Sequence, residues 1–340
     1  MSSLENRMKL SIALATYNGE KYLQEQLDSL LAQTVQPDEV VISDDRSTDR
    51  TIEIAKEFQK RAPFDVIVHQ NEQQKGFIKN FDKALSLTSG DLVFLCDQDD
   101  VWFEHKLETI RDTAIKHPEY SVYMNDALLT DGQLNQTDLT VQQQIQGLGR
   151  PLTQFITGCC AAIRRSHLDK VMPLPDDYPS HDGWIINLAD ALREKWIISD
   201  VLQLYRRHGN NTSNSTHGQL RKMTRFDTVK TMVRRIQTNG EEVSLRHDER
   251  KLQVLLKQEK NLVELMNASQ RNHLLQYLKK KRQYVQFQHK RLKIRELPFH
   301  KRVLCIQKNY VNQNYDQILG YKSALRDLLG SKVSQRDGHE

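Results

Sequence analysis

The chain has 340 residues, of which 38% are hydrophobic and 27% charged, a composition typical of a globular protein with one large or two smaller domains. No apolar run approaches the ~18–20 residues that span a bilayer, and the N-terminal segment lacks the apolar core of a signal peptide. Residues 1–215 carry 22 Lys and Arg against 32 Asp and Glu, whereas residues 216–340 carry 27 against 12. This division predicts two regions with different partners.

The first 125 residues alternate short apolar runs with amphipathic stretches. Strands are predicted at residues 9–16, 39–43, 65–69 and 92–96, and helices at 22–31, 48–61, 77–87 and 103–116. Such alternation requires crossover connections, and continuously apolar strands indicate a sheet that is covered on both faces. We therefore expect an α/β fold with a mostly parallel, doubly wound sheet flanked by helices.

Residues 120–206 break this alternation. Here the pattern predicts strands at 120–127 and 155–163, a helix at 182–192 and a strand pair at 196–205. From about residue 216 the pattern is helical and basic, with an apolar stripe formed by Leu252, Leu255, Leu256, Leu262, Val263, Met266, Leu274, Leu275 and Leu278. We therefore divide the chain into an α/β domain at 1–215 and a basic helical region at 216–340.

The four cysteines, Cys96, Cys159, Cys160 and Cys305, form no CxxC pair, and three of them lie in or beside apolar runs. This pattern favours reduced thiols that pack as small hydrophobic residues over a disulfide framework or a zinc site. Reduced thiols are typical of a cytoplasmic protein.

Polar residues follow the predicted strands, at the carboxyl ends where ligands bind in such sheets. They are Thr16, Tyr17 and Asn18, then Asp44 and Asp45, then Asn71, and then Asp97, Asp99 and Asp100. Three carboxylates within four residues raise one another's pKa, and a divalent cation removes that cost. Hard oxygen ligands favour Mg²⁺ or Mn²⁺, and a diphosphate would supply the remaining ligands. A solvated acidic loop that caps the next helix is the alternative.

Asp45 is placed to accept a hydrogen bond from a nucleobase N–H, and an ordinary Asx turn into the helix at residue 48 is the alternative. The sequence contains neither GxGxxG nor GxxxxGK[ST], which disfavours a standard dinucleotide fold or a P-loop. A nucleotide held by carboxylates and a metal, without a glycine cradle, is the remaining expectation.

Seven segments carry a family resemblance: LATYNGEKYLQEQLDSLLAQT, VVISDDRSTDRT, NEQQKGFIKNFDKAL, SGDLVFLCDQDDVW, FITGCCAAIRR, PSHDGW and LYRRHGNN. Over roughly residues 8–212 they resemble family 2 glycosyltransferases. CDQDD, TGC, HDGW and YRRHGNN are most similar to the bacterial rhamnosyltransferases of cell-surface polysaccharide assembly. The resemblance implies a Rossmann-like GT-A catalytic domain, a nucleotide-sugar donor such as dTDP-rhamnose or a UDP-sugar, and an inverting transfer to a glycan or lipid-linked saccharide.

The resemblance also implies a role for individual residues. Asp182 matches the catalytic base, and His181, Trp184 and Gly158 lie at the acceptor side. Asp99 and Asp97 match metal ligands, with His208 as a further candidate. The donor-binding set comprises Thr16, Tyr17, Asn18, Asp44, Asp45, Lys79, Asn80, Asp97 and Arg206. Asp45 would contact the base, and Arg206 and His208 belong to a segment that closes over the diphosphate.

The sequence is also compatible with two rival functions. One is a nucleotidyltransferase of similar fold, although ATYNGEK at residues 15–21 is a poor match to the glycine- and lysine-rich loop of such enzymes. The other is a non-catalytic scaffold in a glycan-assembly complex. YRRHGNN stands in for the QxxRW signature of processive synthases, so transfer of a single sugar is expected.

The basic C-terminal region lies outside the resemblance. Its clusters at residues 279–282 and 290–295 predict docking on an anionic membrane surface, at the inner face of the plasma membrane. A solvated helical hairpin or a helix pair that forms a homo-oligomer is equally compatible with the pattern. Nucleic acid is not an expected partner, because no reader module accompanies the charge.

Overall fold

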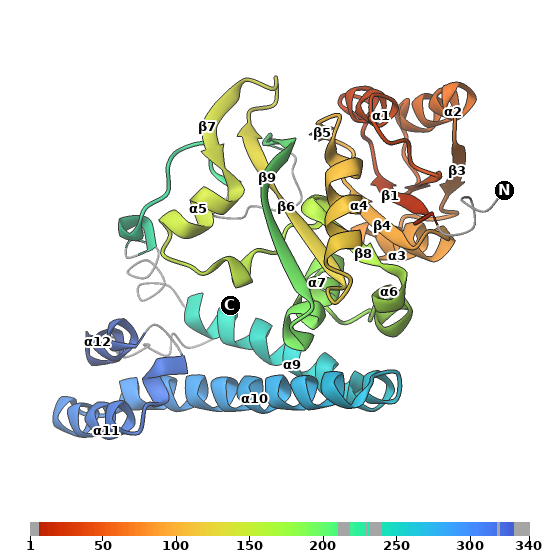
Figure 1. Cartoon of the computed structure of the whole chain (residues 1–340). Coiled ribbons are helices and arrows are strands. Elements are labelled where there is room, and N and C mark those ends of the chain that lie inside the picture. The colour runs from red at the N-terminus through yellow and green to blue at the C-terminus, as the bar shows by residue number, and fades with distance from the viewer. Residues whose placement is uncertain (1–6, 210–217, 229, 231–239, 318–319, 330–340) are drawn as a thin grey trace. The chain divides into compact units, whose positions relative to one another are not determined.

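The computed structural model describes residues 7–209, 218–228, 230, 240–317 and 320–329 (Figure 1). The chain divides into two compact units, Met1–Arg225 and Phe226–Glu340. Each unit has its own secondary structure and its own packed side chains.

The first half of the N-terminal unit is a parallel sheet in the order β3-β2-β1-β4. The strands are β1 (Leu10–Thr16), β2 (Glu39–Asp44), β3 (Asp65–Gln70) and β4 (Leu92–Cys96). The crossover helices are α1 (Leu23–Leu31), α2 (Thr51–Arg61) and α3 (Phe77–Leu87). Figure 1 shows α1 and α2 on one side of these strands and α3 on the other. The predicted helix-flanked α/β layers are confirmed.

The second half of the sheet is mixed and continues β4-β8-β6-β9-β5, with β7 paired to β6. Its elements are β5 (Val101–Trp102), α4 (Lys106–Lys116), β6 (Val122–Thr130), β7 (Gln136–Thr140), α5 (Val141–Gly147), β8 (Ala161–Arg164), α6 (Arg165–Val171), α7 (His181–Leu192) and β9 (Lys195–Arg206). β6 and β9 are parallel, whereas β8 runs antiparallel to both of its neighbours.

Two predicted elements in this half are corrected, and three further elements were not predicted. The strand expected at 155–163 begins only at Ala161, because a 3-10 turn at Gly158–Cys160 precedes it. The strand pair expected at 196–205 is one strand, β9, which follows β6 through two register shifts. β5, β7 and α5 were not expected, since two-residue strands and polar strands lack a clear apolar period.

The main core lies between one face of the sheet and helices α1, α2 and α4. It contains alternate strand residues such as Ile12, Leu14, Ile42 and Phe94, which point to one side because successive side chains of a strand alternate. All four cysteines are free thiols, and Cys96, Cys159 and Cys160 are buried. This packing holds the carboxyl ends of β1, β2 and β4 at fixed positions.

The C-terminal unit is helical, as predicted. It comprises α9 (Gly240–Glu264), α10 (Ala268–Glu296), α11 (Phe299–Val311), a 3-10 turn (Asn314–Gln317) and α12 (Tyr321–Leu329). Asn267 begins α10 with a capping box, in which its side chain accepts from the Gln270 N–H at 2.9 Å. Most of the predicted apolar stripe is buried, but Leu275 is exposed.

Two arginines of the predicted basic cluster at 290–295 are not surface residues. Arg291 and Arg295 are buried, and both donate to Asp327 of α12, which also accepts from the Tyr315 hydroxyl at 2.8 Å. They stabilise the helical unit, because a buried carboxylate requires such partners. Among the residues that the structure describes, no helix has the length and apolar character needed to span a membrane.

Candidate functional site

The loops that follow β1, β2 and β4 are tied to one another by hydrogen bonds. The Gln98 side chain accepts from the Tyr17 N–H at 2.9 Å and donates to the Tyr17 carbonyl at 3.1 Å. Asn18, whose φ is 46°, accepts from the Thr48 N–H at 2.9 Å, and its own N–H donates to the Ser47 hydroxyl. Asparagine tolerates this left-handed backbone better than most residues. The three strand ends therefore form one rigid edge.

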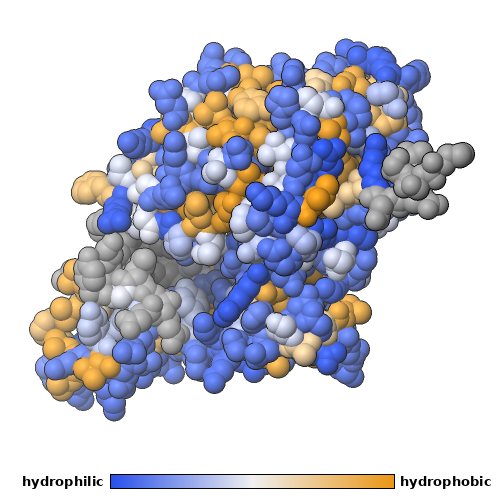
Figure 2. Space-filling view, viewed as in Figure 1, coloured by the Kyte–Doolittle hydropathy of each residue, from blue (hydrophilic) through white to orange (hydrophobic). Residues whose placement is uncertain are grey.

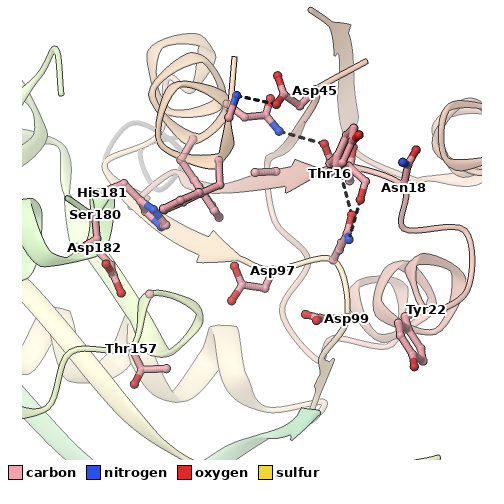
Figure 3. A pocket seen from close by; sticks show the side chains of 18 of the residues that line it. Thr16, Asn18, Tyr22, Asp45, Asp97, Asp99, Thr157, Ser180, His181 and Asp182 are labelled. Carbon is pink, nitrogen blue, oxygen red and sulfur yellow. Dashed lines mark hydrogen bonds between the residues drawn. The ribbon is translucent and has the colours of Figure 1, made fainter. Parts of the chain in front are cut away.

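This edge borders a cavity of about 950 Å³ (Figure 3). Residues 156–158, the start of α7 and the end of β9 complete its wall. Eleven predicted site residues line the cavity: Thr16, Tyr17, Asn18, Asp45, Asn80, Asp97, Asp99, Gly158, His181, Asp182 and His208. A volume of this size accommodates a ligand of several hundred daltons.

Asp45 lies at one end of the cavity and is almost fully buried. Its Oδ1 accepts from the Asn71 side chain at 3.0 Å and from the Lys75 N–H at 2.8 Å, and its Oδ2 accepts from the Gly76 N–H at 2.8 Å. Asn80, at the start of α3, donates to the Thr16 carbonyl at 3.0 Å. A carboxylate has about four acceptor sites, so Asp45 retains one for a ligand N–H.

Asp97 and Asp99 lie near the middle of the cavity, on the turn after β4 (Figure 3). Burial raises the pKa of Asp97 to about 7, and the neighbouring carboxylates Asp99 and Asp182 add to the effect. The Oδ2 atom of Asp99 lies 2.8 Å from Nε2 of His208, whose ring stacks on Tyr22 at a centroid distance of 4.6 Å. The cavity thus gathers negative charge that a cation would neutralise.

Ligand atoms of Asp97, Asp100 and Cys159 lie within 4.8 Å of one another and form a possible metal-binding group. Asp100 already accepts from the Gln203 side chain at 3.0 Å and from the Arg206 N–H at 3.1 Å. A hydrogen bond involving Cys160, together with burial, raises the pKa of the Cys159 thiol well above its usual value, and a protonated thiol is a poor ligand.

The chemistry of the donor set therefore fits a hard cation near the cavity. Asp97, Asp99 and His208 offer carboxylate oxygens and an imidazole nitrogen, which suit Mg²⁺ or Mn²⁺. Asp100 and Cys159 lie behind them, buried and away from the cavity wall.

Asp182 and His181 begin α7 on the side of the cavity that faces Asp97 (Figure 3). Ser180 is the N-cap, and its hydroxyl accepts from the Gly183 N–H at 3.1 Å, which leaves Asp182 in the first turn. The dipole at a helix N-terminus favours an ionised carboxylate. A hydroxyl that enters the cavity would meet this carboxylate.

His181 is buried against Phe81, with ring centroids 3.9 Å apart. Neither of its ring nitrogens has a hydrogen-bond partner among the described residues, and burial lowers its pKa. A Cβ atom on Gly158 would come within 3.2 Å of the His181 ring and 3.3 Å of the Asp182 Cβ. Glycine at this position therefore allows the loop after Thr157 to approach α7 closely.

Two predicted donor-binding residues lie away from the cavity wall. Asp44 is fully buried and accepts from Thr16 at 3.0 Å, from Ser47 and from Gln70 at 3.3 Å, so it holds the strand ends together. Lys79 does not line the cavity, and its ammonium pairs with Asp82 and Asp176.

Arg206 and Trp184 also lie outside the cavity wall. Arg206 is buried, and it donates to the Asp99 carbonyl at 2.7 Å and pairs with Glu25, so it supports the turn from behind. Trp184 is buried in the core, where its indole N–H donates to the Val171 carbonyl at 2.8 Å.

Arg207, which the sequence patterns do not single out, lines the cavity next to His208. One of its guanidinium nitrogens lies 3.1 Å from the Tyr205 hydroxyl. Arg206 is the last residue of β9 and is buried, whereas Arg207 follows the strand and reaches the cavity. The residues that surround the pair in the printed sequence do not indicate which arginine faces the cavity.

Comparisons with known proteins agree with this geometry. A family model described as Glycosyl transferase family 2 matches residues 11–172. The chain is 30% identical over 221 residues to an uncharacterized glycosyltransferase of Nostoc sp., a match that covers 61% of this chain and 67% of the relative. It is 29% identical over 218 residues to the dTDP-rhamnosyl transferase RfbG of Shigella flexneri, covering 58% of this chain and 72% of the relative.

A solved structure shares the fold. The crystal structure of residues 1–349 of S. aureus TarS, in complex with UDP-GlcNAc, superposes with a TM-score of 0.52. The match covers 94% of this chain and 90% of that one, at 18% sequence identity. The sheet, the cavity at its carboxyl edge and the relatives lead to one conclusion: the chain belongs to the family 2 glycosyltransferases and has their GT-A fold.

Proposed function

We propose that the chain is a metal-dependent, inverting glycosyltransferase that moves one sugar from a nucleoside-diphosphate donor to a hydroxyl of a glycan or lipid-linked acceptor. One observation carries this proposal. A single cavity is lined by an acceptor for a base N–H at Asp45, by the carboxylates Asp97 and Asp99, and by a separate carboxylate at Asp182. These three functions correspond to the base, the diphosphate and the attacking alcohol.

The nucleoside end of the donor would lie at Asp45. The three hydrogen bonds from Asn71, Lys75 and Gly76 hold the Asp45 carboxylate in one orientation. A fixed, buried acceptor favours a base that presents an N–H toward it, a requirement that thymine and uracil meet through N3–H and guanine through N1–H. Among such donors, the similarity to a dTDP-rhamnosyl transferase favours dTDP-rhamnose.

The diphosphate would lie beside the turn after β4. Asp97, Asp99 and His208 are the residues that would hold Mg²⁺ or Mn²⁺ there, and such a cation neutralises the charge that develops on a leaving diphosphate. Arg207 is the candidate side-chain cation at this end of the cavity, in place of Arg206. Arg206 would act by holding the Asp99 backbone in position.

The acceptor would enter between Gly158 and the start of α7. Asp182 would take the proton from the attacking hydroxyl, because it is the carboxylate that faces the metal turn from across the cavity. The unpartnered nitrogens of His181 are available to a second hydroxyl of the acceptor sugar. Trp184 has no place in this contact, since it belongs to the core.

A panel of nucleotide sugars incubated with the purified chain and Mn²⁺ or Mg²⁺ tests the proposal. Release of dTDP or UDP, lost on chelation of the metal, is the expected result. Release of pyrophosphate would indicate a nucleotidyltransferase instead. Tight metal-dependent binding of every donor without release of any nucleotide, even with glycan acceptors present, would indicate a non-catalytic scaffold.

A further inference from the structure

Helix α11 of the C-terminal unit exposes an unusual number of large apolar side chains. Phe299 and Leu304 are each 64% exposed, and Val311 is 74% exposed. Val303 and Tyr310 on the same helix are also exposed. Figure 2 shows the corresponding apolar surface at the lower left, where Figure 1 places α11. Clustered exposure of this kind marks an interaction site more often than scattered single residues do.

The exposed side chains share the outward half of α11. Residues of a helix are 100° apart around its axis, so Phe299, Val303 and Tyr310 fall on one line and Leu304 and Val311 on a second line, about 110° further around the helix. The opposite half of the helix packs inside the unit. There Asn309 is buried, and Arg302 donates to the Leu328 carbonyl of α12 at 3.1 Å.

The apolar face lies within a strongly basic segment. Residues 265–315 contain 12 Lys and Arg and a single acidic residue, Glu296. Arg291 and Arg295 are buried with Asp327, but Lys301 and Lys308 of α11 are exposed. On α10, which contacts α11, the exposed lysines Lys279, Lys290 and Lys293 fall along one line of the helix.

We propose that α11 is an interfacial helix, which inserts Phe299, Leu304 and Val311 among the acyl chains of an anionic lipid surface while the lysines contact the headgroups. A helix with large apolar residues on one face and lysines beside them has the composition of such anchors. The positive charge of this segment indicates which partner binds the apolar face of α11. A second copy of the chain would bring another positive face against the first, whereas an anionic bilayer attracts it.

This inference is independent of the transfer reaction, since it involves the C-terminal unit alone. It gives a physical reason for a basic helical unit in a family 2 enzyme. An enzyme held at the lipid surface meets lipid-linked saccharides at a raised local concentration.

Cosedimentation of the full chain with vesicles tests the inference. The vesicles are phosphatidylcholine alone or phosphatidylcholine mixed with phosphatidylglycerol. The unchanged chain should bind the anionic vesicles, and the combined substitution Phe299→Ser, Leu304→Ser and Val311→Ser should weaken binding at least about tenfold. Lys301→Gln with Lys308→Gln should weaken it too, and Ile115→Ser, an equally exposed apolar residue of α4, should leave it unchanged.

Circular dichroism and nucleotide release in solution, each expected to match the unchanged chain, show that the variants are folded. Loss of vesicle binding with retained nucleotide release supports the inference, whichever acceptor the enzyme uses. Undiminished binding by the triple variant would overturn it. A dimer in analytical ultracentrifugation that the triple substitution dissociates, with no effect on vesicle binding, would overturn it in favour of self-association.

Discussion

His208 lies 2.8 Å from the carboxylate of Asp99, although 109 residues separate them in the chain. β9 makes this contact possible. It pairs with β5, which directly follows the turn that carries Asp99, so the residues after β9 place His208 beside that turn. Arg206 fixes the same turn from behind through the Asp99 carbonyl. The end of β9 and the turn after β4 therefore act as one structural unit.

Asp99→Asn should abolish metal-dependent binding of the donor. The amide is neutral and a weaker ligand, so the diphosphate would lose the cation that bridges it to the chain. Isothermal titration of dTDP or UDP with and without Mn²⁺ measures the effect. Asp112→Asn, a change of the same chemistry at an exposed position of α4, should bind as the unchanged chain does. If nucleotide binding depended equally on the metal in both variants, Asp99 would not be a metal ligand.

Asp182→Asn should preserve donor binding and reduce the transfer rate by about 10²–10⁴-fold, the usual contribution of a general base. The amide keeps the shape of the side chain but cannot accept a proton. The decisive comparison is between kcat for transfer and Kd for the donor, measured on the same preparation. A variant that transfers at the normal rate would assign the base to another residue.

Gly158→Ala should impair transfer more than donor binding. The added methyl group would come within 3.2 Å of the His181 ring and 3.3 Å of the Asp182 Cβ, so both side chains would have to shift. Misplacement of a reacting group by about 1 Å can cost about 10²-fold in rate. Gly132→Ala is the matched control, because its nearest neighbour would lie at 3.4 Å, an ordinary contact. Equal kcat values in the two variants would contradict the close approach.

Lys106→Met should destabilise the N-terminal unit by about 1.5–3 kcal/mol, the range for hydrogen bonds to charged groups. Lys106 is buried, donates to the Cys159 carbonyl at 2.8 Å and to the Gln203 side chain, and lies 3.8 Å from the Trp102 ring centroid. Gln203 in turn donates to Asp100. Urea unfolding measures the change. A loss below about 0.5 kcal/mol, the level of ordinary surface substitutions, would show that this network contributes little.

The stability of the N-terminal unit should decline in acid partly through His167. Burial lowers the pKa of this histidine, whose ring lies 3.0 Å from the Ile185 carbonyl. Below the unfolded pKa of about 6.5 the unfolded chain takes up a proton that the folded chain resists, so stability falls as the pH drops and is unaffected above that range. Urea unfolding at about pH 7.5 and about pH 5.5 should show a smaller pH effect in His167→Gln. An identical pH effect would refute this contribution.

The strand–helix alternation of residues 9–116 was predictable, because buried parallel strands and amphipathic helices leave strong apolar periods in the sequence. The strand ends were predictable for the same reason, and 11 predicted site residues line one cavity. The second half of the sheet was harder to predict. The strand expected at 155–163 begins only at Ala161, because residues 158–160 form a 3-10 turn at which Gly158 approaches α7 closely, and periodicity carries no such information.

The direction in which individual side chains point was the other feature that the sequence patterns did not predict. Asp182 and Trp184 are two residues apart on α7 and so point to different sides, which assigns Asp182 to the cavity and Trp184 to the core. Helical geometry alone would have separated them. The choice between Arg206 and Arg207 depends instead on the register of β9 against β6, with its two shifts. No local pattern reveals such shifts.

The most direct measurement is a crystal structure of the chain with Mn²⁺ and a dTDP- or UDP-sugar, with data collected at the manganese absorption edge. The expected result is one anomalous peak between Asp99 and the diphosphate, the base next to Asp45, and Asp182 across the cavity from the metal. Nucleotide bound elsewhere, or a peak at Asp100 and Cys159 with none at Asp99, would contradict the proposed site.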